Sequence, residues 1–406
     1  MSARKSARTR GGAGISAALV GGVLRGLRAG ELVVEMPDGS EHLFAGQTPG
    51  PSARVVVRDS AAARRVLLGG SVGMAEGYMD GSWDSPDLEA VLDLGLSNLS
   101  LGWAADVPFV LRPLQRLLHA ANDNDPRGGS RRNIQRHYDL GNDFYGLWLD
   151  STMTYSAACE VAESEPVSDE QLACAQHRKW DRMLGLIDPR RGDHMLEIGC
   201  GWGGFAMHAA REAGCRVTGL TLSEEQAILA RQRVKEAGLD GLVDIRLQDY
   251  REVSGTFDRI ASIEMFEAVG VKWWPTFFGQ IKGLLAPAGV AALQTITIAD
   301  ETFEDYRHNP DFIQRYIFPG GMLPSPQRFA AAAQMSGLSV GEPHFFGSDY
   351  YRTLGAWTAR FEAALPGVRA LGFDERFIRM WRYYFAYCRT GFDHRSIDVM
   401  QVRLQP

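Results

Sequence analysis

A glycine-rich segment in the middle of the chain has the residue types and spacing of a ligand-binding turn. Residues 194–204 (HMLEIGCGWGG) place an apolar run before a cluster of glycines, and residues 205–210 continue with a helical pattern. Glycine adopts backbone conformations that other residues avoid and lets the chain approach a ligand closely. The segment therefore predicts a buried strand, a turn beside a ligand and a helix. The simpler alternative is a tight strand-to-helix turn with no ligand.

The residues after this turn favour one class of cofactor. A dinucleotide-binding fold usually carries an acidic residue at the end of its second strand, about 20 positions on, to bind the ribose. Here residues 215–220 form the expected strand, and Thr221 and Leu222 follow it without such an acid. Glu197 before the glycines and Asp249 further on instead suit a nucleoside that carries a short chain without phosphate. We therefore expect S-adenosylmethionine rather than NAD.

Apolar runs that resemble strands alternate with helical patterns from about residue 133 to 345. This alternation is typical of an α/β fold with a mostly parallel sheet, which would position the glycine turn at the end of a strand. Before it, the sequence predicts a basic arm at residues 1–25, expected to be disordered, a small α+β domain at 26–118 and a linker at 119–132. Residues 133–406 would form the catalytic domain.

The composition indicates a soluble globular protein of two or three domains. The chain has 406 residues, 45% of them hydrophobic, and its 43 Lys and Arg against 49 Asp and Glu give a formal net charge of −6. This balance argues against a nucleic-acid partner bound through overall positive charge. Five scattered cysteines without the spacing of metal ligands favour reduced thiols in a cytoplasmic protein and no metal site. The apolar stretch at 15–24 is shorter than the ~20 residues that span a bilayer, so any membrane contact is expected to be peripheral.

Seven segments follow one another along the chain in an order and spacing that can be compared with a known family. They are residues 134–145, 153–156, 196–204, 220–226, 248–251, 265–267 and 316–321 (YIFPGG). Together they resemble the cyclopropane-fatty-acyl-phospholipid synthase family, to which the mycolic acid methyltransferases are related. The resemblance covers roughly residues 133–406, and more weakly the N-terminal domain through residues 73–81.

The resemblance implies a class I S-adenosylmethionine-dependent methyltransferase, with a Rossmann-like seven-stranded sheet and a helical acyl-binding cap. Its reaction would be methyl transfer to the cis double bond of an acyl chain in a membrane phospholipid, through a carbocation that aromatic faces stabilise. The enzyme would be cytoplasmic and peripheral at the inner face of the bilayer, and a homodimer is compatible with this interpretation. The rival interpretations are a methyltransferase for a soluble unsaturated molecule and a lipid-binding relative without activity.

The resemblance also assigns cofactor-binding residues by position. Asp249 either joins them or only caps the adenine end of the cofactor. The remaining expected cofactor contacts are Tyr155, Ser156, Gly199, Gly201, Thr221, Leu222, Gln226 and Tyr250.

In the family, a bicarbonate ion held by a Cys, a Glu, a His and a Tyr accepts the proton that the reaction releases. Glu267 and Tyr350 match two of these holders. Ala157 stands in place of the Cys, with Cys159 two residues off register, and Gln294 stands in place of the His. The family's usual His beside the Glu is Ala268, and Glu264 stands where a Gly is usual. Bicarbonate is therefore a doubtful second ligand.

These departures support one hypothesis. The Glu264 carboxylate would occupy the bicarbonate space and accept the proton itself, with Gln294 orienting it by a hydrogen bond. The product would be either a cyclopropane or a methyl-branched alkene, and the sequence leaves both open. The alternative is that Glu264 is an ordinary strand-end residue in a degraded site.

Two aromatic segments are also open to two interpretations. Residues 272–275 (KWWP) would either reach the lipid headgroups or begin a core helix. Residues 373–387 would form a packed helix in preference to a membrane-surface helix.

Overall fold

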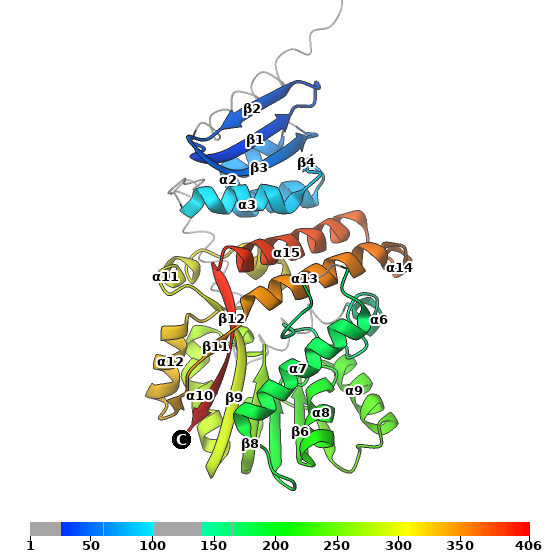
Figure 1. The fold of residues 1–406 in the computed structure, drawn as a ribbon, viewed down its shortest axis with the longest axis vertical. Coiled ribbons are helices and arrows are strands. Elements are labelled where there is room, and N and C mark those ends of the chain that lie inside the picture. The colour runs from blue at the N-terminus through cyan, green and yellow to red at the C-terminus, as the bar shows by residue number, and fades with distance from the viewer. Residues whose placement is uncertain (1–25, 60, 101–139, 164–165) are drawn as a thin grey trace, which may run out of the picture. The chain divides into compact units, whose positions relative to one another are not determined.

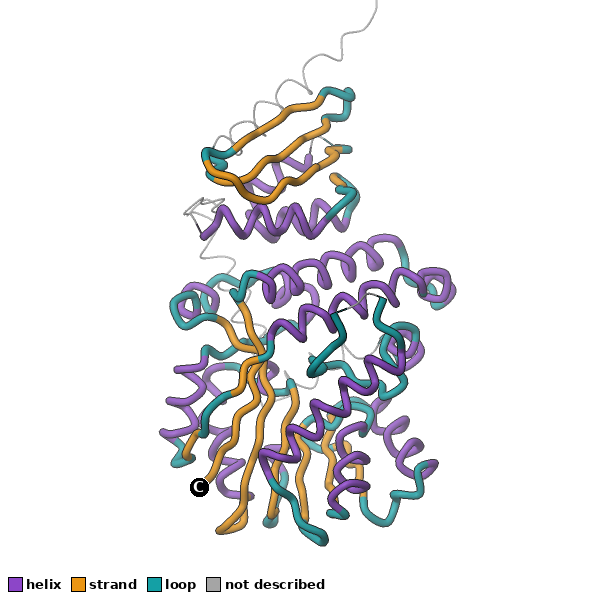
Figure 2. Tube along the Cα trace, viewed as in Figure 1, coloured by secondary structure: helices purple, strands orange, loops and turns teal. Residues whose placement is uncertain are grey.

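The computed structural model describes residues 26–59, 61–100, 140–163 and 166–406 (Figures 1 and 2). The expected arm at 1–25 and linker at 119–132 lie outside these residues. Across the described helices, none combines the length and apolar composition needed to cross a membrane.

The chain divides into two compact units. The first comprises Met1–Gln115 together with Phe373–Thr390, and the second comprises Arg116–Gly372 with Gly391–Pro406. The sequence-based boundaries therefore differ from the structure at residues 373–390, which we had placed in the catalytic domain. The physical reason is packing. Arg379 donates hydrogen bonds to the carbonyl oxygens of Tyr78 and Trp83, and its guanidinium lies 3.9 Å from the centroid of the Tyr78 ring.

The first unit is an α+β arrangement around a four-stranded sheet in the order β2-β1-β3-β4. β1 pairs parallel with β3, and the other pairs are antiparallel. Trp381 and Tyr383, on the C-terminal helix α15, are each 1% exposed, so this segment is a packed helix, as the sequence favoured. The elements are β1 (Ala29–Glu35), β2 (Glu41–Ala45), β3 (Thr48–Val57), α2 (Ala61–Met79), β4 (Trp83–Asp84), α3 (Leu88–Ser100) and α15 (Glu375–Asp393).

The second unit is built on a sheet in the order β10-β12-β9-β8-β5-β6-β7, with β11 paired to β12. β7, β6, β5, β8 and β9 are parallel, whereas β12 pairs antiparallel with β9. This confirms the predicted α/β methyltransferase fold. The strands are β5 (His194–Ile198), β6 (Arg216–Thr221), β7 (Val243–Leu247), β8 (Phe257–Ile263), β9 (Leu285–Ile298), β10 (Ser339–Val340), β11 (His344–Phe345) and β12 (Ile397–Gln405).

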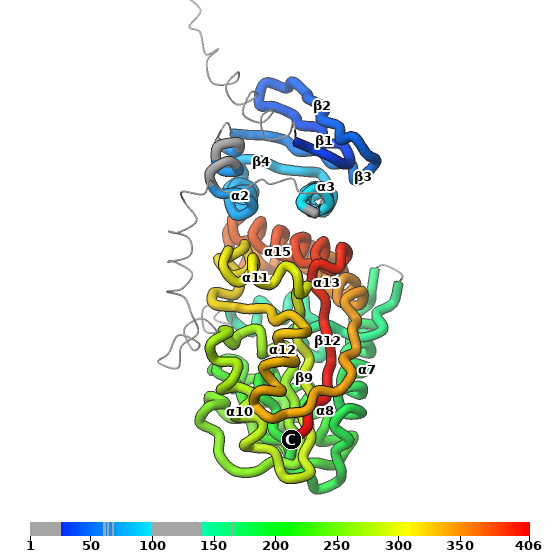
Figure 3. The backbone as a smooth tube through the Cα atoms, turned by 90° about the vertical axis from the view of Figure 1, so that its left-hand side faces the viewer, coloured from blue at the N-terminus to red at the C-terminus, as the bar shows by residue number. Residues whose placement is uncertain are grey.

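Helices of the second unit cover both faces of this sheet (Figures 1 and 3). α7 (Asp169–Ile187), α8 (Gly204–Ala213) and α9 (Glu224–Glu236) pack on one face, and α10 (Trp274–Leu284) and α12 (Pro326–Met335) pack on the other. The remaining helical segments are α6 (Asn142–Gly146), η1 (Tyr250–Glu252), η2 (Phe266–Ala268), η3 (Val271–Trp273), α11 (Phe303–Tyr306), η4 (Ile313–Ile317), α13 (Gly347–Ala363) and α14 (Leu365–Ala370).

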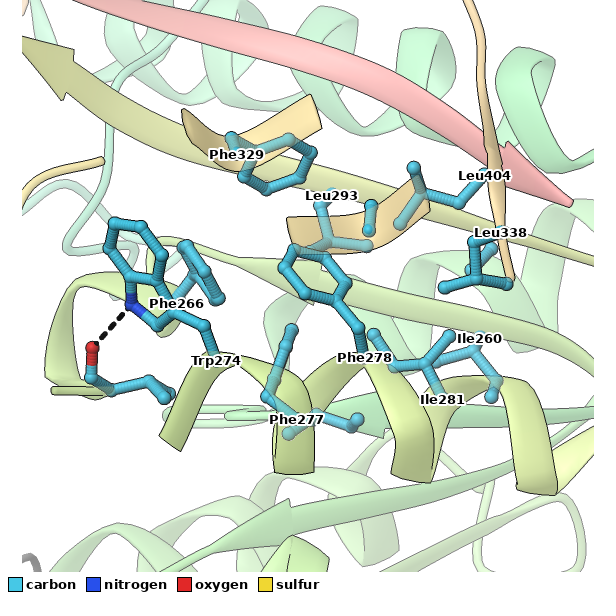
Figure 4. Packing of buried hydrophobic residues seen from close by; sticks show 14 of the residues in the cluster. Ile260, Phe266, Trp274, Phe277, Phe278, Ile281, Leu293, Phe329, Leu338 and Leu404 are labelled. Carbon is cyan, nitrogen blue, oxygen red and sulfur yellow. Dashed lines mark hydrogen bonds between the residues drawn. The ribbon is translucent and has the colours of Figure 1, made fainter. Parts of the chain in front are cut away.

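The core on the α10 side is strongly aromatic (Figure 4). Phe266 packs against Trp274 and Phe278 with ring centroids 5.4 and 5.2 Å apart. Trp274 is 4% exposed, and its Nε1 donates to the carbonyl oxygen of Val269. Residue 274 therefore begins a core helix, the second of the two interpretations offered for the KWWP segment. This buried aromatic layer supports the loop between β8 and α10, which carries the acidic residues of the site.

Candidate active site

The glycine turn at the end of β5 has the geometry that the sequence predicted. Gly199, Gly201 and Gly203 have φ values of 86°, 52° and 79°, in the left-handed region that favours glycine. A Cβ atom at Gly199 would lie 2.8 Å from the Met265 side chain, whereas a Cβ at Gly201 would meet nothing within 4 Å. The turn therefore presses against the residue that follows Glu264 and leaves open space at Gly201.

The next strand, β6, ends in a turn fixed by its own polar side chains. Thr221 Oγ1 donates to Gln226 Oε1 at 2.7 Å and accepts from the backbone N–H of Ser223 at 3.1 Å. Thr221 and Gln226 are buried, whereas Leu222 is half-buried. The structure thus places these three expected cofactor residues beside the glycine turn, at the carboxyl edge where ligands bind to open parallel sheets.

Asp249 and Tyr250 follow β7 at the same edge. Both carboxylate oxygens of Asp249 accept hydrogen bonds from the Arg251 guanidinium, at 2.9 and 2.5 Å. Asp249 also caps η1 by accepting from the backbone N–H of Arg251. Tyr250 packs on Phe277 at 5.3 Å, and burial raises the pKa of its hydroxyl to about 12. Asp249 therefore acts first as a local cap and ion-pair partner.

Glu197, at the penultimate position of β5, is 2% exposed, and its Oε2 has no hydrogen-bond partner among the described residues. Burial raises the pKa of this carboxyl to about 8. A buried polar atom without a partner usually marks a place where a ligand or water completes the hydrogen bonding. The open space at Gly201 and this oxygen both fit a cofactor with a polar, non-phosphate tail.

Glu264 lies at the centre of a second cluster, at the end of β8. Its Oε1 accepts from the backbone N–H of Ala157 at 2.9 Å and from Gln294 Nε2 at 2.7 Å, and its Oε2 accepts from the Tyr350 hydroxyl at 2.8 Å. Burial raises the pKa of the Glu264 carboxyl, while Lys179 and these donors oppose the rise. The bond from Gln294 that the hypothesis required is present.

The backbone of Glu264 has φ = 49°, a left-handed conformation that glycine adopts easily and glutamate does not. This accounts for the glycine that the family resemblance led us to expect at this position. Such conformations cost of order 1–3 kcal/mol and persist where the surroundings fix them. Two sets of hydrogen bonds hold Glu264 in this conformation. Three donors bind its carboxylate, and its backbone N–H donates to the Gln294 carbonyl at 2.8 Å.

Gln294 is held in turn by a strand that joins the sheet from the end of the chain. Gln401 on β12 faces Gln294 on β9 in register, and its Nε2 donates to Gln294 Oε1 at 2.8 Å. Gln294 is 1% exposed and Gln401 is fully buried. The amide of Gln294 is therefore oriented with its N–H groups toward Glu264.

Glu267 is bound differently from Glu264. Its Oε1 accepts from the backbone N–H of Ile296 at 2.5 Å and from Thr295 Oγ1 at 3.0 Å, whereas its buried Oε2 has no partner within the part of the chain that the structure describes. Burial, with a smaller contribution from the charge of Glu264, raises the pKa of the Glu267 carboxyl to about 8.

Cys159, the thiol nearest in sequence to the family's cysteine position, is buried. Its backbone N–H donates to the Ala175 carbonyl, and burial raises the pKa of its thiol to about 12. Cys159 therefore remains a protonated, buried side chain.

Aromatic rings surround the segment that carries Ala157. The Tyr155 ring centroid lies 5.5 Å from those of Tyr145 and Trp148 and 5.4 Å from that of Trp357. Phe318 stacks on Tyr155 at 6.5 Å. The contributions of Tyr145, Trp148 and Phe318 could not be predicted from the sequence, because rings from distant segments meet only in the folded chain.

Lys179 is a further residue that the sequence analysis missed. It is fully buried on α7, and its Nζ donates to Ser156 Oγ at 2.7 Å. The available signal was its position on the apolar stripe of that helix, with Leu172, Ala175, Gln176, Met183 and Ile187.

Comparison with known proteins decides the family. The family model described as mycolic acid cyclopropane synthetase matches residues 127–402. The chain belongs to this family. Tuberculostearic acid methyltransferase UfaA1 of Mycobacterium tuberculosis is 41% identical over 85% of this chain and 81% of its own length. The cyclopropane-fatty-acyl-phospholipid synthase of Escherichia coli K12 is 38% identical over 84% of each chain.

A solved structure of the mycolic acid cyclopropane synthase CmaA1, complexed with SAH and CTAB, superimposes with a TM-score of 0.62 at 32% identity. The match covers 68% of this chain and 98% of that one. The protein is thus an S-adenosylmethionine-dependent methyltransferase of the cyclopropane synthase family that acts on lipids.

Proposed function

We propose that this enzyme methylates the cis double bond of an unsaturated acyl chain in a membrane phospholipid, and that Glu264 accepts the proton released. The observation that carries the proposal is the Glu264 carboxylate, held by Ala157, Gln294 and Tyr350. By family resemblance, this is where a bicarbonate ion would sit. The phospholipid substrate is supported by the E. coli relative, which is named for it.

S-adenosylmethionine supplies an electrophilic methyl group. An alkene is a weak nucleophile, so the chain must align the double bond with that group and exclude water. The Tyr155 ring is half-buried and lies 5.4 Å from the Trp357 ring, and an aromatic face attracts a cation by about 0.5–2 kcal/mol. Tyr155 is therefore suited to stabilise the carbocation that forms on the acyl chain.

The carbocation becomes a neutral product when it loses a proton to the Glu264 carboxylate. Loss from the newly added methyl group closes a cyclopropane, and loss from a chain carbon after a hydride shift gives a methyl-branched alkene. In either case the acid formed is Glu264 itself, with its Oε1 held by Ala157 and Gln294. Burial makes this carboxylate a better base than one in water, because it destabilises the charged form.

The test is Glu264→Gln, assayed on vesicles of an unsaturated phospholipid with S-adenosylmethionine. We expect loss of turnover by at least about 100-fold, the usual contribution of a general base, with the affinity for the cofactor unchanged. Full activity in this variant would refute the role of Glu264.

The product is identified by expressing the chain in a bacterium without a cyclopropane synthase and analysing its fatty acids by mass spectrometry. A cyclopropane and a methyl-branched alkene are the two outcomes that support acyl methylation, and an unchanged fatty-acid profile contradicts it. We further propose peripheral action at the cytoplasmic face of the membrane. Turnover on vesicles well above that on free unsaturated molecules would support this placement, and the reverse would contradict it.

A further inference from the structure

Lys179 carries a buried positive charge. The methyl transfer and proton loss proposed above assign no role to it. Its side chain is fully inaccessible to solvent, and its ammonium donates one hydrogen bond, to Ser156 Oγ at 2.7 Å. No carboxylate of the described residues lies within ion-pair distance of it. A buried ammonium is costly unless nearby charges compensate for it, so its surroundings indicate what it does.

Four acidic groups lie near enough to raise the pKa of the Lys179 ammonium, against the larger effect of burial. In order of their effect they are Glu264, Cys159, Asp150 and Glu197. The Cys159 thiol is protonated, since burial raises its pKa to about 12, and burial raises the pKa of Glu197 to about 8 and that of Asp150 as well. Glu264 is the carboxylate among them that accepts from three separate donor groups, which favours its ionised form.

α7 also fixes the segment that holds Glu264. Gln176 Nε2 donates to the Ser156 carbonyl at 3.0 Å, Lys179 binds the Ser156 hydroxyl, and Arg178 donates to the Glu160 carbonyl at 2.7 Å. The N–H that follows Ser156 in the chain, that of Ala157, is the backbone donor to Glu264. Lys179 is therefore linked to Glu264 in two ways. One is the electrostatic interaction between the two groups, and the other is the hydrogen bond from Lys179 to Ser156, whose neighbour Ala157 binds Glu264.

We propose that Lys179 is a positioning residue for proton transfer: its buried ammonium supplies the counter-charge of the Glu264 carboxylate and fixes the segment whose N–H binds that carboxylate. This inference rests on the proposed function, because it assigns Lys179 a role through the base. An anchor for the segment alone would need only a neutral donor, and Gln176 already provides one. The charge is what Lys179 adds.

The first test is the pH dependence of turnover in Lys179→Met. A nearby cation lowers the pKa of a carboxyl, so removing it raises the pKa of Glu264, against which Tyr350 and Glu267 also lie. The base is active when ionised, so the rising limb of the rate profile should move to higher pH by about one unit or more. Activity on the acidic side should then fall about tenfold or more. Because burial lowers the pKa of Lys179 to about 8, the wild type and the variant should converge above that pH.

Two further variants separate charge from structure. Lys179→Arg keeps a cation and should leave the limb near its wild-type position. Gln176→Met removes a buried hydrogen bond from the same helix to the same segment, so it should lower the rate without moving the limb. The inference would be overturned if the rising limb of the pH–rate profile were unshifted in Lys179→Met. It would also be overturned if this limb shifted equally in Gln176→Met.

Thermal unfolding of the full chain gives a readout that needs no turnover. If the two charges interact, the loss of melting temperature in the double variant Lys179→Met, Glu264→Gln should be smaller than the sum of the two single losses. If Lys179→Met does not fold, the neutral double variant should recover folded protein. Additive losses, or no recovery, would overturn the inference.

The outcomes distinguish this inference from the proposed function. Full activity in Glu264→Gln refutes the proposed function. An inactive Glu264→Gln, together with an unshifted pH–rate profile in Lys179→Met, refutes this inference alone.

Discussion

At the scale of single residues, backbone strain in this protein gathers around the proposed base. Five described non-glycine residues have a positive φ: Met153, Glu160, Asp188, Glu264 and Arg395. Two of these bracket the segment that carries Ala157, and a third is Glu264 itself. Strained backbone is retained where the surrounding contacts over-determine it, often at functional sites. The position of the Glu264 carboxylate is thus maintained against a local cost.

Glu264→Gly tests this arrangement by chemical rescue. The substitution relieves the left-handed strain and leaves a carboxylate-sized space facing the Ala157 N–H, Gln294 Nε2 and the Tyr350 hydroxyl. We expect turnover to fall by about 100-fold or more and then to rise with added bicarbonate or formate, because a small planar anion can accept from the same donors.

Turnover by the wild type should not respond to removal of bicarbonate, since its own carboxylate fills that position. Glu264→Gln is the matched control, because its amide still occupies the space and should prevent rescue. Rescue of Glu264→Gln to the same extent, or a wild type that stops when bicarbonate is removed, would contradict the assignment.

The sequence predicted these residues unevenly. The pairing of Glu264 with Gln294 could be inferred because both depart from one family pattern at positions expected to share a site. Lys179 could not be inferred in that way, because its significance depends on which acids pack around it. Asp249 differs from Lys179, because its bidentate partner Arg251 is only two residues away in the chain.

At the scale of elements, α7 is the part that organises the site. Its N-terminus is fixed by a capping box, in which Ser168 Oγ accepts from the Gln171 N–H at 3.1 Å and Gln171 Oε1 accepts from the Ser168 N–H at 2.8 Å. The same helix then presents Gln176 and Lys179 to the Ser156 residue. The start of α7 therefore sets the register of the groups that hold the site.

Ser168→Ala should destabilise the protein by about 1 kcal/mol, the usual cost of losing an N-cap. Denaturant unfolding measures the loss, and turnover well below the transition should be nearly unchanged. Ser325→Ala is a matched control at the start of α12, because Ser325 makes no capping bond and its buried Oγ meets no hydrogen-bond partner in the described ranges. A loss for Ser325→Ala as large as that for Ser168→Ala would contradict the capping argument.

Local pattern was sufficient for the strand, glycine turn and helix at 194–213, since turn chemistry and apolar periodicity are properties of neighbouring residues. It was not sufficient for the antiparallel strand β12. The Gln294 to Gln401 bond joins residues 107 positions apart, and strand pairing over such a separation is decided by packing. The orientation of the Gln294 amide therefore depends on a segment far from it in the chain.

At the scale of the whole molecule, the first unit is assembled from two stretches that lie far apart in the sequence. Residues 373–390 join a sheet and helices formed by residues before 101. Arg379 is one of the residues that connect the two stretches, with hydrogen bonds to Tyr78 and Trp83 and an ion pair to Asp84 at 3.4 Å. A boundary drawn from sequence alone could not anticipate this, because a domain is normally read as one continuous stretch.

Arg379→Met should therefore lower the stability of this unit by about 2–4 kcal/mol. The substitution removes the buried cation that binds the Tyr78 and Trp83 carbonyl oxygens and the Asp84 carboxylate. It also removes the contact with the Tyr78 ring. The Arg379 side chain is 11% exposed, whereas that of Arg376, which pairs with Asp80 on the same helix, is 49% exposed. Arg376→Met should consequently cost less than about 1 kcal/mol.

Hydrogen exchange of β1, β3 and α15 would locate the effect, because all three should lose protection together in Arg379→Met. If exchange rises in α15 while β1 and β3 keep their protection, residues 373–390 do not share a cooperative unit with the N-terminal sheet, and the division of the chain at residue 373 is wrong.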